Sequence, residues 1–138
     1  MILIISRKYS QLLKKKISND YIGTDIVQIS RINKLILDKG QRFLSHVFTE
    51  NEQSICNAKA SPYIHYGGKF AAKEAVKKAL LSCNDKKNIP FCSIEIQNRV
   101  DGAPKVILNK DIGCLVNLQV SISHTDEYAT ATAILEVK

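Results

Sequence analysis

This sequence lacks the features typical of a membrane protein, of a structural metal site and of a nucleic-acid-binding module. No apolar run approaches membrane-spanning length, so we expect no membrane partner. The four cysteines show no two-residue spacing and form no metal-ligand pattern with the three histidines. We therefore expect reduced, mostly buried thiols of an intracellular protein rather than disulfides or structural zinc. Aromatic residues make up only 7% of the chain and no RNA- or DNA-binding motif occurs, which argues against a nucleic-acid partner.

What the sequence does have is enough length for a hydrophobic core and a large excess of positive charge. Its 138 residues, 45% hydrophobic and 24% charged, are typical of one globular domain. The net charge is +7, and the basic residues are concentrated in residues 1–19, 29–47 and 59–87. Clustered Lys and Arg are the electrostatic footprint of nucleic-acid binding. A non-catalytic basic domain that binds an acidic protein or nucleic acid is therefore the alternative to an enzyme.

Residues 1–20 differ from the rest and are interpreted as a basic N-terminal extension of a single domain that spans residues 21–138. The extension has no acidic residue before Asp20, and its apolar start precedes its positive charges, the reverse of the order in a secretory signal. A basic segment that contains serine is compatible with an organelle presequence, but we favour its packing on the domain. We accordingly expect a cytoplasmic protein, with an organelle as the alternative.

The stretch from Pro62 to Leu81 predicts the central helix of the domain. Small apolar residues recur in pairs at helical spacing, and Ser61 followed by Pro62 is typical of a helix start. Gly67 and Gly68 lie in its middle, where two glycines are unfavourable for a helix. We therefore expect another backbone or a ligand to come close to the helix at these glycines.

The polar face of this helix is basic and contains a single carboxylate. Lys69, Lys73 and Lys77 follow one another at four-residue spacing, where like charges repel unless an anion lies between them. Glu74 lies four residues before Lys78, so an ordinary solvent-exposed ion pair would also explain these two residues. Both interpretations stay open at this point.

Two elements are predicted before the central helix. A β-branched run from Tyr21 to Ile29 predicts a core strand, and the single acid within it, Asp25, needs a cationic partner because burying a lone carboxylate is costly. The segment from Ser30 to Lys39 predicts an amphipathic helix that ends at Gly40 and has a basic outer face.

The remaining pattern predicts one more helix and two hairpins, and hence an α+β fold. Thr49 and Glu52 form a capping box that opens a helix through about Ala58. The predicted hairpins pair Phe91–Gln97 with Lys105–Leu108, and Leu118–His124 with Tyr128–Val137. His124 then lies at the end of a strand, where a histidine either binds a ligand or simply hydrogen-bonds within the turn.

Three separated motifs together resemble one enzyme family. They are Ile22-Gly23-Thr24-Asp25-Ile26-Val27, Lys69-Phe70-Ala71-Ala72-Lys73-Glu74-Ala75, and Val120-Ser121-Ile122-Ser123-His124-Thr125 followed by Tyr128-Ala129. In this combination and order the chain resembles holo-acyl-carrier-protein synthase, the 4′-phosphopantetheinyl transferases of fatty acid biosynthesis. The resemblance implies a small mixed sheet with helices packed on it. It also implies a homotrimer that transfers phosphopantetheine from coenzyme A to a serine of apo-acyl carrier protein, with Mg²⁺.

The resemblance also implies roles for individual residues. Asp25 and Glu74 would hold the metal, and Lys78 would be catalytic with them, because Mg²⁺ binds a few carboxylates together with water and phosphate oxygens. Coenzyme A would be bound by Lys69, Lys73, Lys78, His124 and Thr125. The acidic carrier protein would dock on the basic face formed by Arg31, Lys34 and Arg42. Whether Glu74 or a metal-bound water takes the serine proton stays open.

Three further points concern how far the resemblance extends. The N-terminal extension is additional to the usual family sequence. Residues 82–88 contain no glycine, where relatives have a glycine-rich loop, so the backbone would wrap around coenzyme A differently. The small Ala and Thr residues from Tyr128 to Ala133 would suit either a three-fold interface or a tightly packed internal core.

Overall fold

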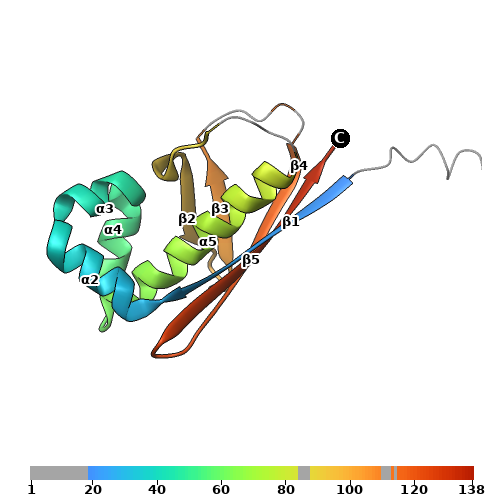
Figure 1. Ribbon diagram of the computed structural model, residues 1–138. Helices are drawn as coiled ribbons and strands as arrows, with labels where there is room; N and C mark the ends of the chain where they lie inside the picture. Colours follow the sequence, from blue (N-terminus) through green and yellow to red (C-terminus); the bar gives the residue numbers. More distant parts are fainter. Residues whose placement is uncertain (1–18, 84–87, 110–112, 114) are drawn as a thin grey trace, which may run out of the picture.

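The computed structural model describes residues 19–83, 88–109, 113 and 115–138. In chain order its elements are β1 (Asn19–Gln28), α2 (Ile29–Lys39), α3 (Gln41–Val47), α4 (Glu50–Asn57), α5 (Pro62–Ser82), the 3₁₀ turn η1 (Phe91–Ser93), β2 (Ile94–Asn98), β3 (Pro104–Leu108), β4 (Leu115–His124) and β5 (Tyr128–Val137). Figure 1 shows α5 lying across the strands, with α2, α3 and α4 gathered at one end. The predicted α+β class is confirmed.

The strands form two antiparallel sheets, one of three strands and one hairpin. The larger sheet has the order β1-β5-β4, and the smaller pairs β2 with β3. Every pairing among the described strands is antiparallel. The expectation of a mixed sheet is therefore wrong. Hairpin turns join β2 to β3 and β4 to β5, which makes these pairs antiparallel, and β1, from the start of the domain, also runs antiparallel to β5.

Helix α5 packs on the larger sheet through very small residues. Ala71, Ala75 and Ala79 of the helix are fully buried, as are Ala129 and Ala133 of β5. Tyr128 to Ala133 therefore uses its alanines for an internal core, one of the two explanations that the sequence left open. The threonines between them point to the other face of the sheet, where they are exposed.

Gly23 is where β1 comes closest to α5. A β-carbon at this position would lie 1.9 Å from the carbonyl oxygen of Ala75 and 2.5 Å from the amide nitrogen of Ala79. Only glycine fits such a backbone contact. Gly67 and Gly68 of the helix face Ile29 and Ile122. A β-carbon added at Gly67 would lie 3.2 Å from the Ile29 side chain, and one added at Gly68 would lie 3.3 Å from the Ile122 side chain. A close approach at the helix glycines was expected, but here it is made by the side chains of the core.

The three short helices complete the core at the start of α5. The rings of Phe48 and Tyr66 contact each other at a tilt, with centroids 4.8 Å apart, and Ile29, Ile32 and Val47 are buried in the same core. The predicted helix over 30–39 and the capping box of Thr49 and Glu52 are both present. Helix α3 was not predicted, because its seven residues are too few to show a clear helical period.

Some sequence predictions fall on residues outside the described ranges. They are the packing of residues 1–18, the state of Cys114, and the wrapping of coenzyme A by residues 84–87 within the 82–88 loop. Of the helices that are described, none combines the length and apolar character that crossing a membrane requires.

Candidate active site

Asp25 forms an ion pair with Lys78 between β1 and α5. The alternation of β1 turns Gly23, Asp25 and Val27 toward the helix. The Lys78 ammonium lies 2.9 Å from Asp25 Oδ1 and donates a second hydrogen bond, also 2.9 Å, to the carbonyl of Thr24. The Asp25 side chain is 15% exposed and that of Lys78 is 51% exposed. The prediction that Asp25 needs a cationic partner is confirmed, and the pair is open to solvent on one side.

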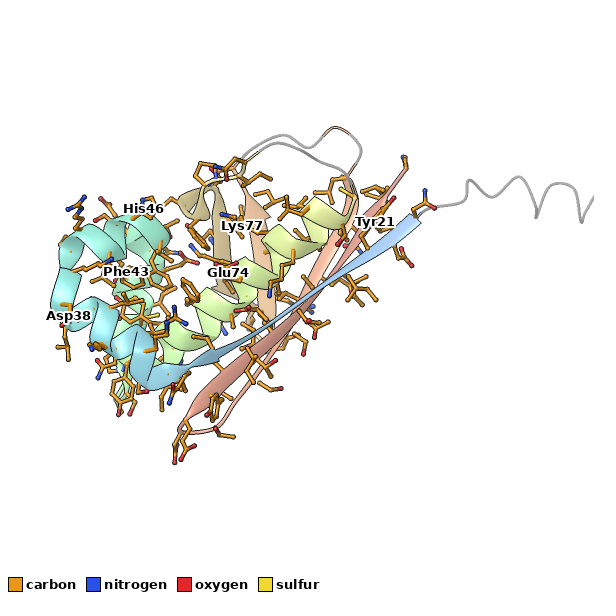
Figure 2. All side chains as sticks on the ribbon, viewed as in Figure 1. Tyr21, Asp38, Phe43, His46, Glu74 and Lys77 are labelled. Atoms are coloured by element: carbon orange, nitrogen blue, oxygen red, sulfur yellow. The ribbon has the colours of Figure 1, made fainter. Side chains whose placement is uncertain are left out.

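Glu74, which is labelled on α5 in Figure 2, lies four residues before Lys78, about one helical turn away. The ion pair between Glu74 and Lys78, one of the two interpretations that the sequence left open, is not formed in the described part of the chain, where Lys78 pairs with Asp25 instead. Within that part no hydrogen bond uses the Glu74 carboxylate, which is half-buried. Glu74 thus lies one helical turn from Lys78 without pairing with it, and its oxygens have spare capacity to accept a ligand.

This carboxylate pair fits a hard cation that keeps water and substrate oxygens as its other ligands. In the described residues no cluster of three or more His, Cys, Asp or Glu side chains could enclose a metal. A site for zinc needs at least three protein ligands, whereas Mg²⁺ is commonly held by one or two carboxylates together with phosphate oxygens. Asp25 and Glu74 therefore suit Mg²⁺ in the presence of a phosphate-containing substrate.

Lys73 does not lie on an exposed polar face, contrary to the sequence prediction. Its ammonium is fully buried, 2.5 Å from Glu52 Oε2, and it also donates hydrogen bonds to the carbonyls of Val47 and Phe91 at 2.7 and 3.2 Å. Burial lowers the pKa of Lys73, while Glu52 acts to raise it. Because the three ammonium protons already have acceptors, none is free for a phosphate of coenzyme A in this structure.

Lys69 is also buried, so the expectation of an exposed lysine stripe is wrong for two of its three members. Only 5% of Lys69 is exposed, and its ammonium donates to the carbonyl of Ile96 in β2 at 2.5 Å. Burial lowers its pKa. Lys77, the third member, lies over the ring of Phe91 at 4.0 Å from the centroid. These lysines are turned toward β2 and η1, away from Asp25.

His124 lies on a different side of α5, at the end of β4 as predicted. It borders a pocket of about 260 Å³ between α5, β2 and β4, together with His65, Gly68, Lys69 and Asn98. Burial lowers the pKa of His65, and the nearby Lys59, His124 and Lys69 lower it further. The pocket thus places two histidine side chains, which can hydrogen-bond a ligand, beside Lys69.

Thr125 shapes the turn that follows His124. Its hydroxyl accepts hydrogen bonds from the amides of Glu127 and Tyr128 at 3.2 and 3.1 Å, and its own amide donates to the carbonyl of Tyr128 at 2.8 Å. The turn thus fixes the end of β4, which carries His124.

One chain does not bring His124 to the two carboxylates. Asp25 is on β1 and His124 on β4, the two outer strands of the sheet, with β5 between them. Two strand spacings separate their backbones by about 10 Å. The Asp25 side chain contacts α5 at Lys78, whereas His124 borders the pocket beside Gly68. The predicted site residues therefore form two separate groups in the monomer.

The predicted docking residues lie on two helices rather than one. Arg31 and Lys34 are exposed on α2, while Arg42 is exposed on α3. Gly40 separates the helices with a φ of 53°, in the left-handed region that glycine adopts readily. Arg42 borders a pocket of about 570 Å³. The other residues that line this pocket, both apolar and charged, are Asp38, Lys39, Phe43 and His46.

Glu52 is the charged residue of this region whose second role the sequence did not reveal. Its place in the capping box was predicted, but its ion pair with Lys73 joins residues that are 21 positions apart. No local pattern indicates such a pairing. The local signal at Glu52 is its place as the last residue of the capping box, and that signal predicts only a helix cap.

Comparisons with known proteins agree with the motifs. Residues 21–133 match the family model of the 4′-phosphopantetheinyl transferase superfamily. The chain is 44% identical over 116 residues to the holo-[acyl-carrier-protein] synthase of Protochlamydia amoebophila, an alignment that covers 82% of this chain and 94% of the relative. Its fold is similar to that of a Bacillus anthracis holo-(acyl-carrier-protein) synthase solved in complex with CoA (3′,5′-ADP), with a TM-score of 0.69 and 33% identity, over 86% of this chain and 96% of that one.

A second solved structure extends the comparison. The holo-[acyl-carrier-protein] synthase of Helicobacter pylori, in complex with coenzyme A, aligns with a TM-score of 0.71 and 32% identity, over 83% of this chain and 98% of that one. Both the sequence and the fold thus match the same kind of enzyme over nearly its full length. Because the family model covers most of the chain, including Asp25, Glu74 and His124, this chain belongs to the 4′-phosphopantetheinyl transferase superfamily.

Proposed function

We propose that this protein is a holo-acyl-carrier-protein synthase, which transfers 4′-phosphopantetheine from coenzyme A to a serine of apo-acyl carrier protein. The observation that carries the proposal is the group of Asp25, Glu74 and Lys78 on one side of α5. The two carboxylates suit a divalent cation, and the partly exposed ammonium of Lys78 suits the phosphate oxygens that such a cation would carry. The reaction would serve fatty acid biosynthesis in the cytoplasm, where the carrier protein would be found.

The reaction exchanges one phosphorus–oxygen bond for another. The serine oxygen of the carrier attacks the β-phosphorus of coenzyme A, and the bond from that phosphorus to the bridging oxygen breaks. Adenosine 3′,5′-bisphosphate leaves with the bridging oxygen, and the serine proton is released. Negative charge accumulates on the pyrophosphate oxygens, so cations fixed beside them lower the barrier.

Asp25 and Glu74 would hold Mg²⁺, the chemistry of which is to neutralise charge on the phosphate oxygens as a Lewis acid. Lys78 is the lysine best placed to contact the same phosphates. Its side chain is half exposed and lies beside Asp25, whereas Lys69 and Lys73 are buried and bonded to protein. Lys78 is therefore the fixed cation of the proposed site. Glu74, which has spare acceptor capacity, is the protein group available to receive the serine proton.

We further propose that the active site is shared between the chains of a homotrimer. Within one chain α5 separates the carboxylate group from His124 and Thr125, so a complete site takes the second group from a neighbour. The outer face of the larger sheet supports association, because Ile22 and Ile26 are 60% and 69% exposed and Ile134 is 46% exposed. An uncovered row of apolar side chains on a sheet favours burial against another chain.

The acidic carrier protein would dock on the basic surface of α2 and α3. Arg31 and Lys34 are exposed on one helix and Arg42 on the next. Positive charge at this surface would guide an acidic partner to it and speed association. No nucleic acid and no membrane take part in this proposal.

The test of the proposed function is the mass of the carrier protein. Apo-acyl carrier protein is incubated with this protein, coenzyme A and Mg²⁺, and a parallel sample contains a chelator. We expect a gain of one phosphopantetheine group in the first sample and little gain in the second. No gain at any Mg²⁺ concentration, together with tight binding of nucleic acid, would favour the non-catalytic basic domain instead.

A further inference from the structure

The buried charges on the other side of α5 form a network that ties this helix to two neighbouring elements. Glu52 accepts three hydrogen bonds: from the amide of Thr49 at 2.9 Å, from the amide of Ile96 at 2.8 Å, and from the ammonium of Lys73 at 2.5 Å. Lys73 adds bonds to the end of α3 and to η1 through the carbonyls of Val47 and Phe91. One carboxylate thus joins α4, β2 and α5.

A second buried lysine ties α5 to the same strand residue. The ammonium of Lys69 donates a hydrogen bond to the carbonyl of Ile96, and the amide of Ile96 donates one to Glu52. Both backbone groups of Ile96 on the side away from β3 are therefore bonded to charged side chains. The outer edge of β2, which would otherwise present unpaired backbone groups, is held against α4 and α5.

Larger side chains of α5, such as Tyr66, Val76 and Leu80, are also buried, but the face of the helix that meets the larger sheet offers few side chains that could fix its rotation. Its surface against the larger sheet consists of glycine and alanine, among them Gly67, Gly68, Ala71, Ala75 and Ala79, which form only low ridges. Small residues let the helix approach the sheet closely, but they provide few interlocking side chains. The directional bonds of Lys69 and Lys73, one helical turn apart, supply the constraint that these small residues lack.

The position of Lys73 connects this constraint to the active site. Lys73 directly precedes Glu74 on the same rigid helix. A bond that fixes the direction of the Lys73 side chain therefore also fixes the direction in which Glu74 leaves the helix. We infer that Glu52 is a positioning residue: through its buried ion pair with Lys73 it sets the rotation of α5 and so holds Glu74 in place for the metal. This inference rests on the proposed function.

The experiment measures Mg²⁺ binding and thermal stability in the same variants. Mg²⁺ is titrated by calorimetry into the full-length protein in the presence of coenzyme A and without carrier, so that no turnover occurs. The informative variant is Glu52→Gln combined with Lys73→Met, which removes the charge pair without leaving one charge buried alone. We expect its dissociation constant for Mg²⁺ to rise about 10-fold, as for the loss of a residue that orients a metal ligand.

Two controls separate positioning from general stability. Ile94→Val removes one methyl group from the buried part of β2 and leaves the ion pair intact. It should lower the melting temperature yet bind Mg²⁺ as the wild type does. Glu50→Gln makes the same charge change as Glu52→Gln at an exposed position of α4 and should alter neither property. The Michaelis constant for the carrier protein should be unchanged in the two controls, because they leave α2 and α3 as they are.

The inference is overturned if the double variant folds and binds Mg²⁺ like the wild type, or if Mg²⁺ affinity follows melting temperature across all variants. If the double variant does not fold, Glu52→Asp takes its place. It keeps the charge but shortens the reach, so the same weakening to a smaller extent is expected, and wild-type Mg²⁺ affinity in it would equally overturn the inference. A wild-type protein that fails to modify the carrier would instead contradict the proposed function.

Discussion

Helix α5 carries charged residues on two sides, and the two sides differ in how completely those charges are partnered. On one side Lys73 and Glu52 are fully buried, and each of their polar atoms has a partner within the protein. On the other side Asp25 and Lys78 are partly exposed and Glu74 has spare oxygens. The difference teaches that a charge is a candidate for function when its bonding capacity is left unfilled, and structural when it is filled.

The largest expected effect is on activity, from removing either carboxylate of the open side. Asp25→Ala and Glu74→Ala should each lower the rate of carrier modification by more than about 100-fold, because each would remove one of the two proposed metal ligands. Their melting temperatures should stay close to that of the wild type, since both side chains are only partly buried. Near-normal turnover at ordinary Mg²⁺ concentration in either variant would refute the two-carboxylate site.

The buried side should respond in the opposite way, with a loss of stability. Lys73→Met leaves the Glu52 carboxylate buried without its cation and should cost about 3–5 kcal/mol of unfolding free energy. Lys78→Met breaks an ion pair that is half exposed and should cost only about 0–1 kcal/mol. Urea unfolding measures both. Equal losses in the two variants would remove the distinction between the sides.

Gly23 sharpens the comparison because it sets the distance between β1 and α5. Gly23→Ala would place a methyl group against the backbone of α5 at Ala75, so we expect a loss of about 3 kcal/mol or more and displacement of Asp25. Gly113→Ala is the matched control, since a β-carbon there meets no atom within 4 Å. If Gly23→Ala proved as stable as Gly113→Ala, the close packing of β1 on α5 would be wrong.

A smaller effect is expected at the docking surface. Reversing Arg31 and Arg42 to Glu should raise the Michaelis constant for the acidic carrier at low salt and reduce its dependence on salt, because guidance by charge is lost. The affinity for coenzyme A should not change, and it can be measured without carrier. An unchanged Michaelis constant at low salt would exclude this surface.

The smallest effect concerns the pH dependence of stability at His65. Burial and neighbouring cations lower the pKa of His65 below its ordinary value of 6.5, so the unfolded chain binds more protons between the two pKa values. Stability should therefore rise with pH through this range, and His65→Gln should reduce that rise. Urea unfolding at about pH 5.5 and about pH 7.5 would show it. An identical rise in the variant would assign the pH dependence to other groups.

Much of the fold could be predicted from the sequence because local patterns encode it. The capping box of Thr49 and Glu52, the end of α2 at Gly40 and the two hairpins follow from short-range rules. Helix α5 was predicted from Pro62 to Leu81, and its observed end, Ser82, is one residue later. The antiparallel pairing of β1 with β5 joins residues 100 or more positions apart, which no local pattern reveals.

The site was only partly predictable, because burial is a property of the whole fold. Asp25 signalled its need for a cation as a lone acid in an apolar strand, and the structure supplies Lys78. The four-residue spacing of Lys69, Lys73 and Lys77 is typical of an exposed stripe. In the structure, however, Lys69 bonds to the edge of β2 and Lys73 bonds to Glu52, so both are buried. The sequence contained both partners of the Glu52–Lys73 pair but no signal that joined them.

The most direct test of the account is activity in mixed oligomers. Asp25→Ala and His124→Ala chains, each inactive alone, are co-expressed, and the purified oligomer is assayed for carrier modification. If α5 divides the site so that two chains complete it, about a quarter of all sites should regain both groups when chains assemble at random through head-to-tail contacts. A stable monomer by mass measurement, or mixed oligomers as inactive as each parent, would contradict the shared site.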